Sequence, residues 1–276
     1  MISIKRSDNT EFVFGTVFKI LSLSGAGNLE VDIFSEKKAA GNGDIITGQR
    51  IPSRIITITA ACVSSALNDI SRRTASRFFN PNYTYKMYIN YKDNPVWIPC
   101  VVDSIDLPTS NIYVSQVMTL IMFCSDPYFR SVDEFGKDIA GNTPMMGFPL
   151  LSSLTSGFIT GLFTYPEFVY IENDGDTETF CRAVVVAYGA VTGFKLSKDV
   201  NTYVKFNQAL SVGDELVLDF INASVTLNGV NANRYIDRAS TFFAIDTGGC
   251  NISFSADDGT TLLSCTIYYN KLYAGV

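Results

Sequence analysis

The sequence predicts a mainly β protein of two domains, with one α-helix in the first domain. Three observations predict this fold: apolar runs rich in β-branched and aromatic residues, a single segment with helical spacing, and turn dipeptides at short intervals through the second half. A chain of 276 residues is long enough for each domain to bury its own core. We expect an N-terminal β-sandwich or barrel-like domain over 1–130, a linker over 131–162 and a C-terminal β-sandwich or jelly roll over 163–276.

The first 60 residues contain three predicted strands. Glycines between them are expected to mark turns, because glycine is the residue that most readily leaves an extended path. The predicted strands are Phe12 to Leu23, Leu29 to Phe34 and Ile51 to Ala60, and the turn glycines are Gly25, Gly27, Gly41, Gly43 and Gly48.

A helix is predicted after these strands, because apolar side chains recur at spacings of three and four. Ser64 or Ser65 is expected to cap it, and Asn80-Pro81 to end it. The predicted apolar face consists of Val63, Ala66, Leu67, Ile70, Thr74 and Phe78, and the polar faces include Arg72, Arg73 and Arg77. The three arginines are expected to form a solvated face or a subunit contact.

Three more strands are predicted before a fixed corner in the middle of the chain. They cover Tyr83 to Tyr91, Val96 to Ile105 and Ile112 to Cys124. Asp126 precedes Pro127, which restricts Asp126 to extended geometry and cannot itself donate to an interior ladder. We expect the stretch from Phe123 to Phe129 to end the last strand of the first domain.

The second half reads as antiparallel strands joined by short turns. The predicted turns are Asn173-Asp-Gly175, Asp199-Val-Asn201, Val212-Gly-Asp214, Asn228-Gly229 and Asp257-Asp-Gly259. Asn228-Gly229 is the strongest hairpin signal, since Asn-Gly suits positive φ at both central positions, and Asp258-Gly259 is the second. The preceding linker is rich in Gly, Pro, Ser and Thr.

Composition excludes several classes of function. The chain has a formal net charge of −6 and no histidine, which disfavours a phosphate-binding surface and excludes histidine triads and imidazole proton shuttles. Six scattered cysteines lack any Cys-x-x-Cys spacing and are expected to be buried free thiols, as in a reducing cytoplasm.

Neither a signal peptide nor a membrane span is predicted. Charges in the first eight residues argue against a signal peptide, and proline and polar residues interrupt the charge-poor segments 107–125 and 139–166.

A carboxylate-pair hydrolase remains conceivable, because glycosidases need only two acidic groups at a suitable separation. Its candidate acids are Asp174, Asp176, Glu178, Asp214, Glu215, Asp257 and Asp258. All of them stand in turn sequences, where Asp recurs for local hydrogen bonding, so we predict no catalytic, cofactor-binding or metal residues. Calcium at 173–176 or 257–258 is a minor alternative with unspecific spacing. Tyr268, Tyr269 and Tyr273 are expected to serve packing rather than a sugar platform, because adjacent strand residues face opposite ways.

The ordered set of motifs resembles the siphophage distal tail protein family over nearly the whole chain. The N-terminal half carries Gly48-x-Arg50-x-x-x-Arg54, Arg77-Phe-Phe-Asn-Pro81 and the corner from Phe123 to Phe129. The C-terminal half carries the segment Val169 to Thr177, Leu210-x-x-Gly213-Asp214, Val225-x-Leu-Asn-Gly229, Phe242-Phe243 and Gly248-Gly249-Cys-Asn251. Phe129, where many relatives have tryptophan, and Phe180-Cys181, where proline is expected, depart from the family pattern.

This resemblance implies a non-enzymatic virion component at the tail tip, assembled in the host cytoplasm. It implies a hexameric ring of N-terminal domains, with C-terminal galectin-like sandwiches projecting outward, that joins the major tail tube protein to the tip or baseplate hub. The implied partners are other copies of the chain, the tail tube protein, a tail tip or tail-associated lysin protein and a receptor-binding protein. DNA is expected to pass through an acidic ring without binding. The competing hypothesis is a carbohydrate-binding sandwich module for host recognition, and a third is the carboxylate glycosidase.

Overall fold

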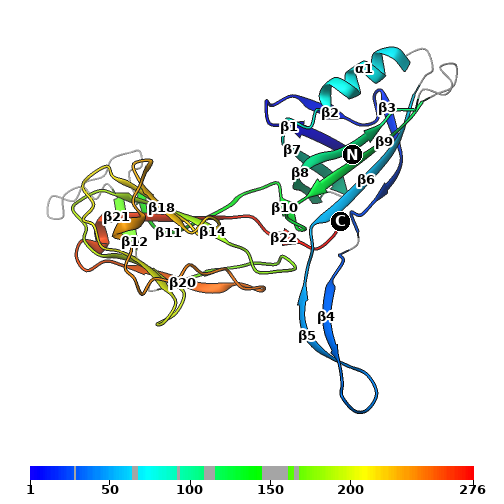
Figure 1. Ribbon diagram of the computed structural model, residues 1–276. Helices are drawn as coiled ribbons and strands as arrows, with labels where there is room; N and C mark the ends of the chain where they lie inside the picture. The colour runs from blue at the N-terminus through cyan, green and yellow to red at the C-terminus, as the bar shows by residue number, and fades with distance from the viewer. Residues whose placement is uncertain (28, 64–67, 92–93, 109–115, 145–160, 165–167) are drawn as a thin grey trace. The chain divides into compact units, whose positions relative to one another are not determined.

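The protein consists of two compact units, each of which is described by itself. The computed structural model describes residues 1–27, 29–63, 68–91, 94–108, 116–144, 161–164 and 168–276. The first unit comprises Met1–Val132 and Leu272–Val276, and the second comprises Asp133–Lys271. Both ends of the chain therefore lie in the first unit (Figure 1), and the second unit is an insertion in its sequence. The mainly β class predicted from the sequence is confirmed, with one α-helix among the described residues.

The first unit is built on one nine-stranded antiparallel sheet and a separate two-stranded hairpin. The order along the sheet is β2-β1-β7-β8-β9-β6-β3, with β10 paired to β8 and β22 paired to β10, while β4 and β5 pair with each other. The strands are β1 Ile2–Arg6, β2 Glu11–Val13, β3 Phe18–Ser24, β4 Asp32–Lys37, β5 Asp44–Arg50, β6 Arg54–Cys62, β7 Tyr85–Tyr91, β8 Asn94–Asp106, β9 Val117–Cys124, β10 Phe129–Ser131 and β22 Leu272–Tyr273.

The core of this unit lies between the sheet and helix α1 (Asn68–Phe78). Alternation along β6 and β9 places every second residue in this core, which is the pattern expected of a half-buried strand. Below the helix end, Phe12 stacks against Phe78 and Phe79 with ring centroids 5.4 and 5.0 Å apart. The Tyr85 hydroxyl donates to the carbonyls of Phe78 and Asn80, which fixes the chain where the helix stops.

Two predictions for the strands at the start of the chain were wrong. The run from Phe12 to Leu23 is two strands, β2 and β3, because the chain turns at Gly15, whose φ is +111°. Gly48 lies inside β5 rather than in a turn, opposite an irregularity in the register at Phe34 and Ser35. The hairpin turn between β4 and β5 holds Gly41 and Gly43, as predicted.

The helix is present, but its buried face differs from the predicted one. Ser71, Ala75 and Phe78 are buried, whereas Thr74 is exposed and Val63, which lies before the helix, is 57% exposed. Phe79, just after the helix, is buried as well. The proposed caps Ser64 and Ser65 lie outside the described residues. The helix ends at Phe78, ahead of Asn80-Pro81, as predicted.

The corner after β9 turns the chain back onto its own sheet. β9 ends at Cys124, and the Asp126 carboxylate accepts hydrogen bonds from the Tyr128 amide at 3.1 Å and from Arg130 at 2.8 Å. The sequence had suggested that β9 is the last strand of the unit. This was wrong, because β10 follows it and pairs with β8. The part of the predicted strand before Gln116 lies outside the described residues.

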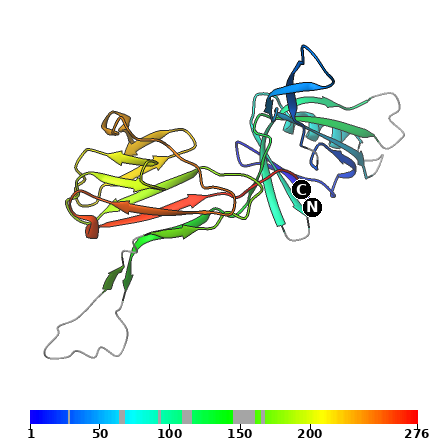
Figure 2. The same cartoon turned by 90° about the horizontal axis from the view of Figure 1, so that it is seen from below.

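The second unit is an antiparallel sandwich of two sheets with the core between them. A seven-stranded sheet in the order β12-β11-β21-β14-β17-β18-β19 faces a four-stranded sheet in the order β13-β20-β15-β16. Figure 2 shows these layers from below. The strands are β11 Phe135–Pro144, β12 Gly161–Thr164, β13 Val169–Ile171, β14 Cys181–Ala187, β15 Phe194–Ser197, β16 Tyr203–Phe206, β17 Glu215–Asp219, β18 Ser224–Leu227, β19 Val230–Asn231, β20 Cys250–Ser255 and β21 Leu263–Tyr269.

Two sequence expectations for this part of the chain require correction. The predicted linker over 131–162 contains β11, which pairs with β21, so this stretch is partly strand. Asp258-Gly259 does not join a hairpin, because β20 and β21 belong to different sheets. The hairpin at Asn228-Gly229 is confirmed: Leu227 pairs with Val230, and both turn residues have positive φ, at 51° and 77°.

Candidate assembly surfaces

The seven candidate acids lie on the surface of the second unit, and Asp174, Asp214 and Asp257 form ion pairs or hydrogen bonds there. Asp214 is half-buried and the other six are exposed. Asp174 pairs with Lys271 at 2.5 Å, and Asp257 pairs with Lys205 at 2.8 Å. Asp214 accepts hydrogen bonds from the Ser211 amide at 2.7 Å and from Asn228 at 2.8 Å. The hydrogen bond from Ser211 to Asp214 is typical of a turn, and the other contacts are surface ion pairs or side-chain hydrogen bonds.

The pKa shifts of two of these acids, Asp174 and Asp214, argue against a role as a proton donor in catalysis. The hydrogen bond from Lys271 holds the pKa of Asp174 below its ordinary value, and that from Asn228 lowers the pKa of Asp214. A glycosidase needs one carboxyl group whose pKa is raised, so that it can donate a proton near neutral pH. Within the described ranges no group of three or more His, Cys, Asp or Glu side chains is arranged to hold a metal ion.

The C-terminal tyrosines do not gather into one platform. Tyr269 is buried and donates its hydroxyl to the Glu172 carbonyl at 2.7 Å, while Tyr268 faces the other way beside Arg182. Tyr273 belongs to β22 in the first unit. On the helix, Arg73 and Arg77 are exposed and Arg72 is half-buried.

All six cysteines are buried free thiols, as the sequence predicted. Burial raises the pKa of the Cys181 thiol to about 12 and also raises that of Cys265. Cys100 and Cys124 are neighbours on β8 and β9. Their mutual hydrogen bond raises the pKa of Cys100 and, with the positive charge of Arg54, lowers that of Cys124. None of these thiols is accessible for reaction from the surface.

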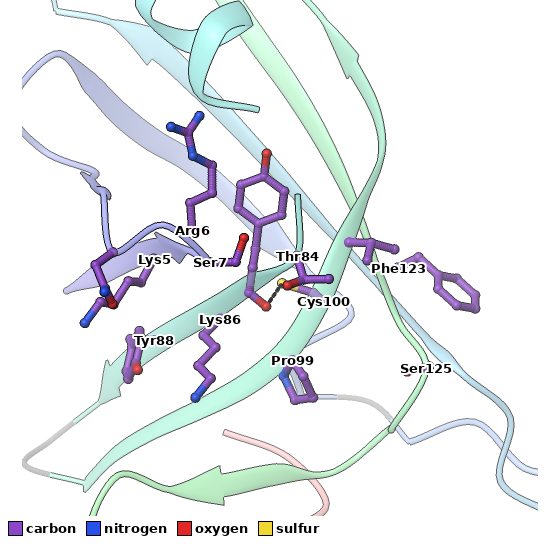
Figure 3. Close-up of a pocket in the computed structure, with 13 residues that line it drawn as sticks. Lys5, Arg6, Ser7, Thr84, Lys86, Tyr88, Pro99, Cys100, Phe123 and Ser125 are labelled. Carbon is purple, nitrogen blue, oxygen red and sulfur yellow. Dashed lines mark hydrogen bonds between the residues drawn. The ribbon is translucent and has the colours of Figure 1, made fainter. Parts of the chain in front are cut away.

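A groove of about 480 Å³ crosses the outer face of the sheet in the first unit (Figure 3). We call it the β8–β9 groove. Its lining comes from β1, β7, β8, β9 and the residues that follow β1 and β9, and it includes Lys5, Lys86, Tyr88, Pro99, Val101 and Phe123. Sequence reasoning missed it, because its residues are the solvent-facing members of strands whose alternation was read only for the core.

Trp97 lies beside this groove, and its ring makes cation–π contacts with two basic side chains. The Lys86 ammonium lies 4.4 Å and the Arg130 guanidinium 5.3 Å from the centre of the ring, and the indole N–H donates to the Ser131 carbonyl at 3.0 Å. Arg130 is also held by Asp126 of the corner. The corner therefore orders a basic and aromatic surface on this face of the sheet.

The β4–β5 hairpin extends away from the sheet of its unit (Figures 1 and 2). Among the described strands, β4 and β5 pair only with each other, and they carry large apolar side chains that are exposed. The exposed fractions are 62% for Ile33, 52% for Phe34, 54% for Ile45 and 68% for Ile46. No described core contains these four residues.

Arg54 joins the base of this hairpin to the end of the chain. Its guanidinium is buried and donates to the carbonyls of Ala26, at 2.9 Å, and of Ala274. It also lies 4.8 Å from the centre of the Phe129 ring. The arginine that follows Gly48 and Arg50 in the family-like motif thus fixes three segments of the first unit.

The negative charge of the chain resides in the second unit. Of the 21 Lys and Arg residues, 13 lie in 1–132 and 8 in 133–276; of the 27 Asp and Glu residues, 11 lie in 1–132 and 16 in 133–276. The first unit is therefore slightly basic and the second strongly acidic. Among the helices of the described ranges, none has the length and apolar character needed to cross a bilayer.

The fold and these surfaces define a two-unit, mainly β protein whose exposed apolar side chains suit it to binding other proteins. Residues 174–273 match the model of the siphovirus-type tail component family, C-terminal domain. No curated protein matches the chain. The predicted resemblance to distal tail proteins is confirmed by this family match and by the fold.

Solved structures from phage tails share the fold over the full length. The Dit protein of phage SPP1, described as a paradigm of the hub adsorption apparatus in phages that infect Gram-positive bacteria, matches with a TM-score of 0.72 at 12% identity, covering 99% of both chains. The baseplate of phage P2 in its activated conformation with Ca matches with a TM-score of 0.52 at 10% identity, covering 100% of this chain and 99% of the other. The same baseplate with Sr gives 0.55 at 11% identity and covers both chains fully.

Proposed function

We propose that this chain is a distal tail protein, a structural component of a siphophage or prophage tail. Six copies form a hub ring through their N-terminal units, and each C-terminal unit is a galectin-like jelly roll carried by the ring. The ring joins the tail tube to the tip or baseplate and to the receptor-binding apparatus.

One observation carries this proposal: the likeness to SPP1 Dit extends over 99% of both chains and includes both units. A shared sandwich alone would not support a hub, because sandwiches serve many functions. The family match over residues 174–273 supports the same reading independently.

The proposed partners are other copies of the chain, the major tail tube protein, a tail tip or tail-associated lysin protein and a receptor-binding protein. The exposed apolar residues of the first unit support protein partners, since exposed apolar patches of this kind mark interaction sites. The protein is proposed to reside at the tail tip of the virion after assembly in the host cytoplasm, where its six free thiols stay reduced.

DNA is proposed to pass the ring without specific binding. The acidic balance that suggested an acidic lumen comes from residues 133–276, whereas residues 1–132 hold 13 basic and 11 acidic residues. Free passage therefore rests on the absence of a strong positive excess rather than on a negative lumen.

We propose no enzymatic role. Six of the seven acids that a carboxylate-pair mechanism could use are exposed and Asp214 is half-buried, and the pKa shifts at Asp174 and Asp214 are downward.

The test is the mass of the full-length protein in solution, measured by size-exclusion chromatography with light scattering and followed by negative-stain imaging. We expect a hexamer with a central opening. A stable monomer that binds sugars on a glycan array would overturn the ring and favour the carbohydrate-binding module. The three tyrosines considered for a sugar platform do not support that alternative, since Tyr268 and Tyr269 face opposite ways on β21 and Tyr273 belongs to the first unit.

A further inference from the structure

The β4–β5 hairpin has apolar residues on both faces and no core of its own. Because neighbouring strand residues face opposite ways, the register places Ile33 and Ile46 on one face and Phe34 and Ile45 on the other. All four are more than half exposed. A two-stranded hairpin alone in water is marginally stable, and an apolar surface of this kind marks an interaction site.

An exposed apolar surface that could bind such a hairpin lies on the sheet of the same unit. Ile55, Phe123 and Val101 are directly paired across β6, β9 and β8, and they form an exposed apolar row. Their exposed fractions are 57%, 37% and 38%. Val101 and Phe123 also line the β8–β9 groove, so an apolar side chain entering the groove would contact both.

The groove and one face of the hairpin also carry charges of opposite sign. The lining of the groove includes the cations Lys5, Arg6 and Lys86. The hairpin face of Phe34 and Ile45 carries Asp32, Glu36 and Arg50, and because Arg50 pairs with Asp32, that face keeps a net negative charge at Glu36. Opposite charges at the rim of an apolar contact steer association and fix its register.

We propose that the β4–β5 hairpin of one copy docks in the β8–β9 groove of the next copy, with Phe34 and Ile45 against Val101 and Phe123. The β4–β5 hairpin and the β8–β9 groove are different parts of the chain, so a contact between two copies through them is heterologous. A heterologous contact that repeats with a closing rotation produces a ring. This inference rests on the proposed hexameric ring and names the residues that close it.

The first test is cross-linking between two variants. Ile45→Cys and Val101→Cys chains are co-expressed with different tags, purified as mixed oligomers and treated with a short bismaleimide. The six native thiols are buried, so the introduced ones react. We expect a covalent dimer carrying both tags, and none when Val212→Cys replaces Ile45→Cys, because exposed Val212 lies in the second unit.

The second test is the assembly of a Phe34→Ser/Ile45→Ser double variant against a Val212→Ser/Ile221→Ser control of similar exposure. We expect the concentration of half-assembly to rise about tenfold for each apolar side chain lost from the contact, with no change in the control. Circular dichroism checks that both variants are folded.

The outcomes separate the two ideas. A hexameric wild type whose double variant assembles normally, without the mixed cross-link, overturns the docking contact and leaves the ring intact. A wild-type protein that stays monomeric at all concentrations overturns the ring, and the docking contact with it.

Discussion

At the scale of single residues, Arg54 connects segments of the first unit that lie far apart in the sequence. It is buried, and desolvation lowers its pKa. Burying a guanidinium is costly unless its donors find acceptors; here the two Nη groups donate to the carbonyls of Ala26 and Ala274, while the buried Nε has no partner among the described residues. The sequence identified Arg54 as part of a motif, but no spacing rule could reveal an acceptor 220 residues away.

Replacing Arg54 by methionine is therefore expected to destabilise the first unit by about 2 kcal/mol, because buried carbonyls lose their donor. Chemical denaturation of the full chain measures this. Arg50→Met is the matched control: Arg50 is exposed and pairs with Asp32 at 3.1 Å, so its loss is expected to change stability by less than about 0.5 kcal/mol. Equal effects of the two substitutions would contradict the role given to Arg54.

Asp8 gives a second prediction at this scale. Hydrogen bonds from Arg6 and Thr10 hold its pKa well below the ordinary value. A lowered folded-state pKa means that the carboxylate stabilises the fold above its unfolded pKa of about 4, and that this stabilisation disappears as the pH falls toward the folded pKa. Asp8→Asn is therefore expected to lower the Tm at pH 7, with a difference from wild type that shrinks below about pH 4. Thermal unfolding across pH 2–7 tests this, and a difference that grows on acidification would contradict it.

At the scale of secondary structure, burial decided which elements the sequence could predict. β7 was predicted because Tyr85, Met87 and Ile89 alternate into the core. β5 was missed because both faces of its hairpin are exposed, so its apolar residues show no alternation. β11 was missed because it is rich in glycine and polar residues, and its pairing with β21 rather than its own propensity makes it a strand.

The turn at Gly25 allows a prediction about β6, which begins close to it. A Cβ atom at Gly25 would lie 2.0 Å from the Ile55 carbonyl oxygen, whereas one at Gly15 would meet nothing within 4 Å. Both glycines have positive φ, so alanine at either position carries the backbone cost of about 1–2 kcal/mol. We expect Gly25→Ala to be clearly more destabilising than Gly15→Ala in chemical denaturation. Similar losses would mean that β6 shifts freely away from the turn.

At the scale of the whole molecule, the sequence predicted two β domains but not that the second is inserted in the first. Boundaries were read from composition, which changes near residue 131, and nothing in composition marks the return at Leu272. β22 has only two residues and is defined by its pairing with β10. The groove and the exposed hairpin were missed for a related reason, since each depends on strands that are distant in sequence.

Removing Leu272–Val276 is expected to destabilise the first unit selectively, because β10 loses its partner strand and Arg54 loses the Ala274 carbonyl. Differential scanning calorimetry of the full and shortened chains measures this. We expect the transition of the first unit to move to lower temperature while that of the second stays in place. A uniform shift of both transitions would instead indicate that the last five residues act on the molecule as a whole.

The contact between Arg54 and Ala274 also determines when the first unit can finish folding during synthesis on the ribosome. Synthesis starts with the first unit, yet its last strand and the Ala274 carbonyl emerge only after all of the second unit. A nascent chain still attached to the ribosome therefore presents an unfinished first unit.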